Sequence, residues 1–180
     1  MVYQYTSREH TNPRSERNSI NVWSGLCRNR LLGPILFEGA LTGQRYLEML
    51  RGPILDFLDD YPLNELQQLW WQQDGAPAHN AGIVTDYLNT VFPGKWIGNR
   101  GVVLWPARSP DLAPHDFFLW GHLKDLVYKT PPNDINLLRQ SLERTMDRVP
   151  GRIIQRAINK VPERIQMCIQ QQGHLFEHLI

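Results

Sequence analysis

Two aspartates stand at positions in the sequence where a carboxylate could bind a metal ion. Asp74 follows the short aromatic run Leu66–Gln73 and precedes small residues and then His79. Because a strand end is rigid and open on one side, a carboxylate placed there suits a hard divalent cation. Asp116 lies in the first turn expected of a helix introduced by Pro114, where the helix dipole favours an ionised carboxylate. Asp74 and Asp116 are therefore candidate metal ligands.

Each of these residues also has an ordinary structural interpretation. An aspartate at a strand end is commonly a turn residue, and an aspartate in a first helical turn is commonly a capping residue. His79 and Arg108 flank the two aspartates, and each could contact phosphate, hold a carboxylate or lie on the surface. The residue types alone leave these interpretations open.

The elements that must position the aspartates form a pattern typical of an α/β fold. The expected strands are residues 19–27, 31–40, 66–73 and 102–105, and the expected helices are 42–58, 80–91, 116–128, 135–149 and 153–161. Thr42 is expected to cap the first helix, and Pro53 to kink or split it. This order predicts a mixed sheet with helices on both faces, where ligands gather beyond the strand ends.

Length and composition exclude several classes of protein. A chain of 180 residues with 42% apolar and 21% charged residues is one packed domain, not a disordered, collagen-like or coiled-coil chain. No run reaches the ~18 apolar residues of a membrane span, and the first twenty residues hold no apolar signal core, so we expect an intracellular protein. Cys27 and Cys168 fit neither a disulfide framework nor a zinc spacing.

The net charge of +1 hides an excess of basic residues in segments 1–34 and 139–164. In the second segment, four arginines recur every fourth residue: Arg144, Arg148, Arg152 and Arg156. Pro150 and Gly151 interrupt the series, so it cannot form one straight stripe on a helix. The series could present a discontinuous basic surface to a DNA backbone, although a solvated helix face has the same pattern.

The sequence around the two aspartates resembles the second and third acidic motifs of mariner-type transposases, a branch of the acidic-triad transposase and integrase superfamily. Residues 70–80 read WWQQDGAPAHN, and residues 104–128 read LWPARSPDLAPHDFFLWGHLKDLVY. In that family, Q-D-x-A-x-x-H ends a central strand, and S-P-D-L-x-P-x-D/E followed by LW opens a later helix. The resemblance extends over residues 18–170.

The resemblance implies an RNase H-like catalytic domain that cuts DNA and joins the resulting 3′-hydroxyl to a target. It implies two divalent ions, Mg²⁺ or Mn²⁺, with Asp74 and Asp116 as catalytic metal ligands. It further implies DNA as a partner, a homodimer and a nuclear location, with no membrane association and no small-molecule cofactor. The candidate nucleic-acid contacts are His79, Arg108, Arg144, Arg148, Arg152 and Arg156.

The N-terminal segment departs from the family pattern. The first acidic residue of the triad should lie on a strand before the hairpin, yet residues 1–19 contain no aspartate. Glu9 and Glu16 stand in polar sequence without strand character, and there is no room for a DNA-recognition helix-turn-helix. We therefore expect an irregular tail at 1–18, an RNase H-like domain lacking its first strand at 19–172, and a C-terminal tail at 173–180.

These observations favour a fragment of a DNA transposase catalytic domain with nucleic-acid binding retained. Without the first carboxylate, we expect little or no strand transfer from this polypeptide alone. The alternative is a non-catalytic, transposon-derived remnant that binds nucleic acid or a protein. A metal-dependent hydrolase of small phosphate esters is a third hypothesis, and it would require a closed substrate pocket.

Overall fold

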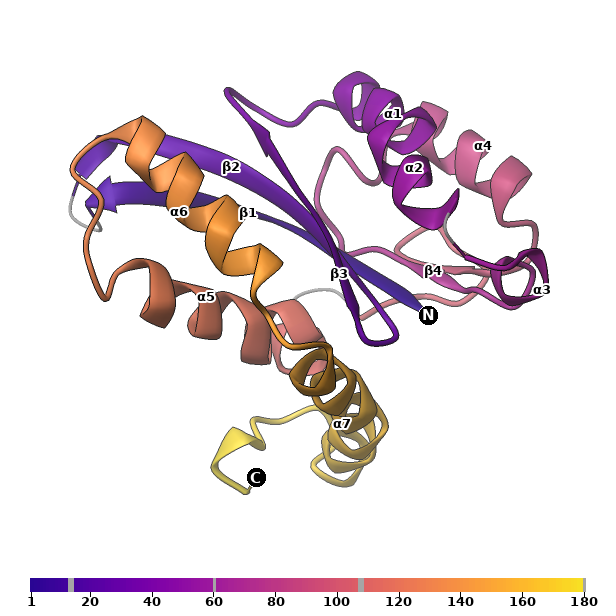
Figure 1. Cartoon of the computed structure of the whole chain (residues 1–180). Coiled ribbons are helices and arrows are strands. Elements are labelled where there is room, and N and C mark those ends of the chain that lie inside the picture. The colour runs from indigo at the N-terminus through magenta and orange to yellow at the C-terminus, as the bar shows by residue number, and fades with distance from the viewer. Residues whose placement is uncertain (13–14, 60, 107–108, 180) are drawn as a thin grey trace.

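The computed structural model describes residues 1–12, 15–59, 61–106 and 109–179. Its centre is a five-stranded mixed sheet in the order β3-β2-β1-β4-β5 (Figure 1). The strands are β1 (Val2–Asn12), β2 (Ser15–Cys27), β3 (Arg30–Phe37), β4 (Trp71–Gln72) and β5 (Trp96–Ile97). β2 pairs in antiparallel fashion with both β1 and β3. On the other side of β1, β4 pairs parallel to β1, and β5 pairs parallel to β4.

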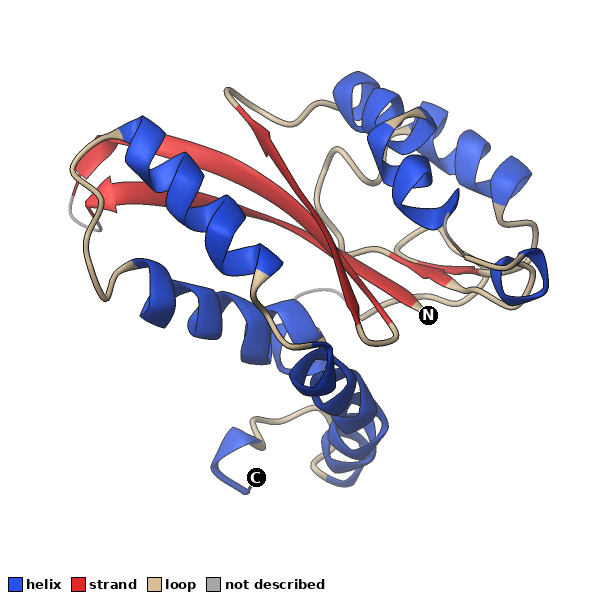
Figure 2. Cartoon of the chain, viewed as in Figure 1, coloured by secondary structure: helices blue, strands red, loops and turns tan. Residues whose placement is uncertain are grey.

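Helices cover both faces of the sheet, as Figure 2 shows. They are α1 (Gly43–Arg51), α2 (Pro53–Asp59), α3 (Leu63–Leu66), α4 (Gly82–Val91), α5 (Trp120–Val127), α6 (Ile135–Asp147) and α7 (Gly151–Gln170). Short turns complete the chain: η1 (Pro110–Leu112), η2 (His115–Leu119) and η3 (Glu177–Leu179). No described helix is both long enough and apolar enough to cross a membrane.

Strand β2 supplies side chains to two separate hydrophobic cores. Trp23 and Cys27 pack in the core beneath α1, α2 and α4, whereas Val22 and Leu26 pack in the core beneath α5, α6 and α7. Successive side chains of a strand point to opposite faces, so this alternation places one helical layer on each side. The predicted mixed sheet with helices on both faces is confirmed.

The first helical layer begins and divides where the sequence predicts. The Thr42 hydroxyl accepts a hydrogen bond from the Arg45 amide N–H at 3.2 Å, which caps α1. The chain leaves α1 at Gly52, and Pro53 begins α2. Proline is tolerated in the first turn of a helix but not in its interior, so the split occurs there.

The N-terminal segment differs from the prediction. Residues 2–12 form β1, the middle strand of the sheet, where we expected an irregular tail and no first strand. β1 pairs with β2 on one edge and with β4 on the other. Strand formation here depends on partners distant in the sequence, so the polar composition of the segment does not reveal it.

The two strands expected near the aspartates are shorter than predicted or displaced. Of residues 66–73, the strand comprises Trp71–Gln72, and Leu66 ends α3. Residues 102–105 make a single bridge, from Val103 to Ile97, and the strand beside β4 is β5. Val102 and Leu104 are exposed by 63% and 72%, so the burial that would stabilise a strand there is missing.

Two further predictions need correction toward the C-terminus. α7 runs past the predicted end at residue 161 and continues through Pro162 to Gln170. The residues expected to form a tail also include an ordered turn, η3, and Phe176 is buried at 1% exposure. An aromatic side chain that is removed from water anchors this segment to the domain.

Candidate metal centre

Asp74 and Asp116, far apart in the sequence, line one cavity of about 490 Å³. The cavity lies beyond the end of β4 and beside η1 and η2. Its lining residues are Asp74, Gly75, Ala76, Asn99, Trp105, Pro106, Ser109, Pro110, Ala113 and Asp116. The structure thus brings together the two carboxylates that the sequence singled out.

A turn directly after β4 fixes the Asp74 carboxylate. Its Oδ1 accepts a hydrogen bond from the Ala76 amide N–H at 3.0 Å and lies 2.5 Å from Nδ1 of His79. Gly75 allows Asn99 to approach, because a Cβ at Gly75 would lie 2.9 Å from the Asn99 Nδ2. The Asp74 side chain keeps 24% of its surface exposed, so its carboxylate is held in place and still reaches the cavity.

His79 supports Asp74 from inside the core. The imidazole is completely buried and its ring centroid lies 4.3 Å from that of Tyr46. The Gln73 side-chain amide donates to the His79 carbonyl at 2.8 Å, and the Tyr46 hydroxyl donates to Gln73 Oε1 at 3.4 Å. A buried ring has no surface to offer a nucleic acid, so the prediction of a DNA contact at His79 is wrong. Its other predicted role, holding a carboxylate, matches the geometry.

The electrostatic surroundings keep Asp74 ionised. Burial alone would raise the pKa of Asp74, but the hydrogen bond and charge of His79 and the Ala76 amide together lower that pKa below its usual value. Burial lowers the pKa of the neighbouring His115 to about 3, so that imidazole is neutral at pH 7. Because Asp74 is ionised and the neighbouring His115 is neutral, the Asp74 carboxylate can attract a cation.

Asp116 lies in a π-helical turn that opens α5. The Trp120 amide N–H reaches back to the His115 carbonyl, which is the wider hydrogen-bonding pattern of a π-turn. The Asp116 amide N–H donates to the Ala113 carbonyl at 2.9 Å. Pro110 begins η1, and Pro114 precedes η2, so the segment that presents Asp116 is stiff. Such π-turns occur frequently at functional sites.

The residues around the cavity fit a divalent ion that binds through oxygen. Mg²⁺ commonly uses one or two protein carboxylates together with water and phosphate oxygens. Asp74 and Asp116 supply two carboxylates, and Asn99 and Ser109 add neutral oxygen atoms to the lining. Within the described part of the chain, no group of three or more His, Cys, Asp or Glu residues forms a metal-ligand cluster.

The backbone register explains why β1 does not complete an acidic triad. Val2 and Tyr3 pair with Trp71 and Gln72, so the positions that follow on β1, Gln4 and Tyr5, continue toward the level of Asp74. Glu9 pairs with Ile20 and lies four residues, or about 13 Å, further along the strand. The strand that we expected to be missing is therefore present, and the two residues that follow its pairing with β4 are glutamine and tyrosine.

Comparisons with known proteins identify relatives of this chain. No family model matches it. The Tc3 transposase of Caenorhabditis elegans is 24% identical over 159 residues, covering 87% of this chain and 45% of the relative. The Mos1 mariner transposase of Drosophila mauritiana is 29% identical over 104 residues, covering 58% of this chain and 28% of the relative. The crystal structure of the Mos1 catalytic domain superposes with a TM-score of 0.80 at 22% identity, covering 98% of this chain and 83% of that one.

This chain is a homologue of the Tc1/mariner transposases. Its fold is the RNase H-like α/β fold of the Mos1 catalytic domain, which confirms the predicted fold class. The Mos1 paired-end complex with Mn superposes with a TM-score of 0.81 at 21% identity and covers 98% of this chain but 56% of that one. This chain thus spans about half the length of the Tc3 and Tcb1 transposases that it matches.

Asn99 lines the cavity and was not predicted from the sequence. It follows β5 by two residues and reaches the cavity beside Gly75. The rule that ligands gather beyond strand ends would have found it, had the strand been placed at Trp96–Ile97. The strand was instead predicted at residues 102–105 because that run is apolar, whereas β5 is Trp96–Ile97.

The predicted nucleic-acid residues that the structure describes do not line the cavity. Arg108 lies outside the described residues. The other four arginines, Arg144, Arg148, Arg152 and Arg156, are exposed on α6, on α7 and at the bend between them. α6 and α7 are separate helices on either side of Pro150, so the four arginines form no single straight stripe, as the interrupted spacing predicted.

Proposed function

We propose that this chain forms part of a transposase catalytic domain that cuts and joins DNA strands with the aid of divalent metal ions. The observation that carries the proposal is the shared cavity of Asp74 and Asp116, two carboxylates from separate elements of an RNase H-like fold. Structures of the Mos1 catalytic domain with Mn and with Mg, and of Mos1 paired-end complexes, provide the precedent for the ions and for DNA.

Each part of the site has a distinct task in this proposal. A Mg²⁺ or Mn²⁺ ion bound here would supply Lewis-acid chemistry toward phosphoryl oxygens and water. Asp74 and Asp116 hold that ion, and His79 fixes the orientation of the Asp74 carboxylate. Asn99 and Ser109 lie where they could orient water or phosphate oxygens. Orientation of this kind sets much of the rate of phosphoryl transfer.

The proposal includes one ion held by the two aspartates and weak strand transfer from this polypeptide alone. A two-metal centre of the kind expected for the family requires a further carboxylate, and residues 4 and 5, on β1, are glutamine and tyrosine. If a missing ligand costs ~4 kcal/mol of transition-state stabilisation, the rate falls about a thousandfold. Binding of metal and DNA is therefore a more sensitive test than turnover.

Metal binding tests the proposal directly. We expect Mn²⁺, followed by electron paramagnetic resonance or calorimetry, to bind the full chain, and Asp74→Asn and Asp116→Asn each to weaken binding at least tenfold, because each removes a carboxylate ligand. Asp111→Asn is the matched control, since its side chain does not line the cavity. Equal affinity in all four proteins would refute the metal site.

DNA as partner, a homodimer and a nuclear location also belong to this proposal. The paired-end complexes of Mos1 support the first two, and the nuclear location follows from DNA as the substrate. The alternative of a non-catalytic remnant is not favoured, because the chain is homologous to transposase catalytic domains and retains both carboxylates at one cavity.

A further inference from the structure

Arg164 on α7 is a buried cation that joins three separate segments of the chain. Its residue exposure is 8%, and every other arginine or lysine whose burial the structure describes is at least partly exposed. Its Nε donates a hydrogen bond to the Asp111 carbonyl, and its Nη2 lies 2.9 Å from Glu177 Oε1. Its guanidinium carbon lies 4.1 Å from the ring centroid of Phe117.

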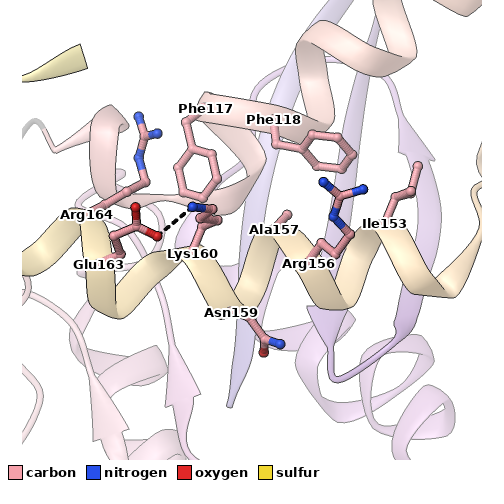
Figure 3. Close-up of a pocket in the computed structure, with 9 residues that line it drawn as sticks. All are labelled: Phe117, Phe118, Ile153, Arg156, Ala157, Asn159, Lys160, Glu163 and Arg164. Carbon is pink, nitrogen blue, oxygen red and sulfur yellow. Dashed lines mark hydrogen bonds and ion pairs between the residues drawn. The ribbon is translucent and has the colours of Figure 1, made fainter. Parts of the chain in front are cut away.

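The partners of Arg164 on one side belong to the segment that presents Asp116. Asp111 is the middle residue of η1, and Phe117 directly follows Asp116 in η2. Figure 3 shows Phe117 projecting from this segment toward α7, across a cavity of about 570 Å³. Arg164 therefore contacts the backbone five residues before Asp116 and the side chain directly after it.

The partners of Arg164 on the other side belong to the C-terminal segment. α7 ends in a left-handed turn at Gly173, whose φ of +83° glycine adopts without strain. The chain then folds back beside α7 (Figure 1), which brings Phe176 and Glu177 to the guanidinium. The Phe176 ring centroid lies 5.6 Å from the guanidinium carbon, and Phe176 is buried.

The chemistry of these contacts favours arginine over lysine. A guanidinium presents five N–H donors in a rigid plane and can stack on an aromatic ring while it donates hydrogen bonds. It can thus satisfy a carbonyl and a carboxylate at once, whereas an ammonium group is a single point charge. A buried cation without such partners is costly, so Glu177 stabilises Arg164 in its position.

We propose that Arg164 is a positioning residue that fixes η1 and η2 and thereby holds Asp116 at the cavity, with Phe176 and Glu177 holding Arg164 in turn. We call the contacts of Arg164 with Asp111, Phe117, Phe176 and Glu177 the clamp. These contacts are a property of the fold and do not depend on a bound metal ion. The consequence of the clamp for metal binding rests on the proposed function of Asp116.

Hydrogen exchange of the metal-free full chain tests the clamp. Four amides report on the segment: Leu112, Ala113, Asp116 and Phe117, each of which donates to a backbone carbonyl of residues 109–113. We expect Arg164→Ala to accelerate their exchange at least tenfold while the amides of α4, in the other core, remain as protected as in the wild type. Arg164→Lys keeps the charge without the planar donors and should rescue the protection only in part.

Matched variants separate the clamp from a general loss of stability. Arg139→Ala removes a partly exposed arginine whose ion pair with Glu38 spans 3.7 Å, and it should leave the four amides unchanged. Glu177→Gln weakens the clamp without removing a buried side chain and should give a smaller acceleration at the same amides. Unchanged exchange in Arg164→Ala, or equal acceleration in α4, would overturn the proposal.

Mn²⁺ affinity tests the link from the clamp to Asp116. We expect Arg164→Ala and Glu177→Gln to weaken Mn²⁺ binding at least threefold, with Arg139→Ala at the wild-type value. Faster exchange with unchanged Mn²⁺ affinity would overturn the link. If the wild type itself binds no Mn²⁺, the proposed metal site fails, and the exchange measurement still decides the clamp.

Discussion

Asp74 and His79 show what residue types in a sequence can and cannot establish. The motif around Asp74 predicts a carboxylate at a strand end, and the structure places it at a cavity with Asp116. For His79, the sequence left a phosphate contact and a carboxylate contact open. The complete burial of His79 beside Asp74 favours the carboxylate contact. That burial depends on how α1 packs over the loop after β4. No local pattern encodes that packing.

The buried side chains behind Asp74 form a chain of hydrogen bonds in which Gln73 is central. Replacing Gln73 with leucine should leave the His79 carbonyl and the Tyr46 hydroxyl without this partner. An unsatisfied buried polar group costs about 1–3 kcal/mol, so we expect the free energy of unfolding to fall by at least that amount. Urea denaturation measures it.

Tyr46→Phe is the control for this change. It deletes one hydroxyl whose hydrogen bond spans 3.4 Å, at the long end of the range, and leaves the Gln73 contact with His79 intact. Its effect should therefore be smaller than that of Gln73→Leu. If the two variants unfold at the same urea concentration, Gln73 does not organise the site.

Element boundaries that depend on residues close to them in the sequence were predicted correctly. The boundary between α1 and α2 follows from Thr42 and Pro53, which act within a few residues of their own positions. β1 was missed because its hydrogen bonds go to β2 and β4, and the latter is nearly seventy residues away. β5 was misplaced because two buried residues after a turn carry less pattern than the exposed apolar run at 102–105.

Two glycines, Gly43 and Gly121, differ in how closely other parts of the chain pack against them. A Cβ at Gly43, the first residue of α1, would lie 2.3 Å from the Cβ of Ala81 at the start of α4. We expect Gly43→Ala to destabilise the protein by about 1–3 kcal/mol, because the two helices must separate. Thermal unfolding provides the measurement.

Gly121 is the matched position on the other helical layer. It lies in α5, is exposed, and a Cβ there would have nothing within 4 Å. Gly121→Ala should therefore stabilise the protein by about 0.5–1 kcal/mol through helix propensity. A lower melting temperature for Gly121→Ala, or an unchanged one for Gly43→Ala, would contradict this account of the packing.

At the scale of the whole molecule, the acidic cavity and the basic helices occupy different parts of one fold. Asp74 and Asp116 lie beyond the end of β4, whereas the exposed arginines follow the bend from α6 to α7. A nearly neutral chain can still bind DNA if its cations are gathered on one surface, since phosphate contacts depend on local charge. The net charge alone could not have predicted this arrangement.

The arginines at the bend should set the salt dependence of DNA binding. Each cation that neutralises a phosphate contributes about 0.9 to the slope of log affinity against log salt concentration. The double variant Arg148→Gln/Arg152→Gln should therefore lower the slope by about 1.8 for a duplex of arbitrary sequence, as measured by fluorescence anisotropy in increasing KCl. Arg51→Gln/Lys129→Gln removes the same number of charges from exposed positions outside α6 and α7, so it controls for net charge. Equal slopes for the two double variants would show that overall charge, and not the surface at the bend, attracts the DNA.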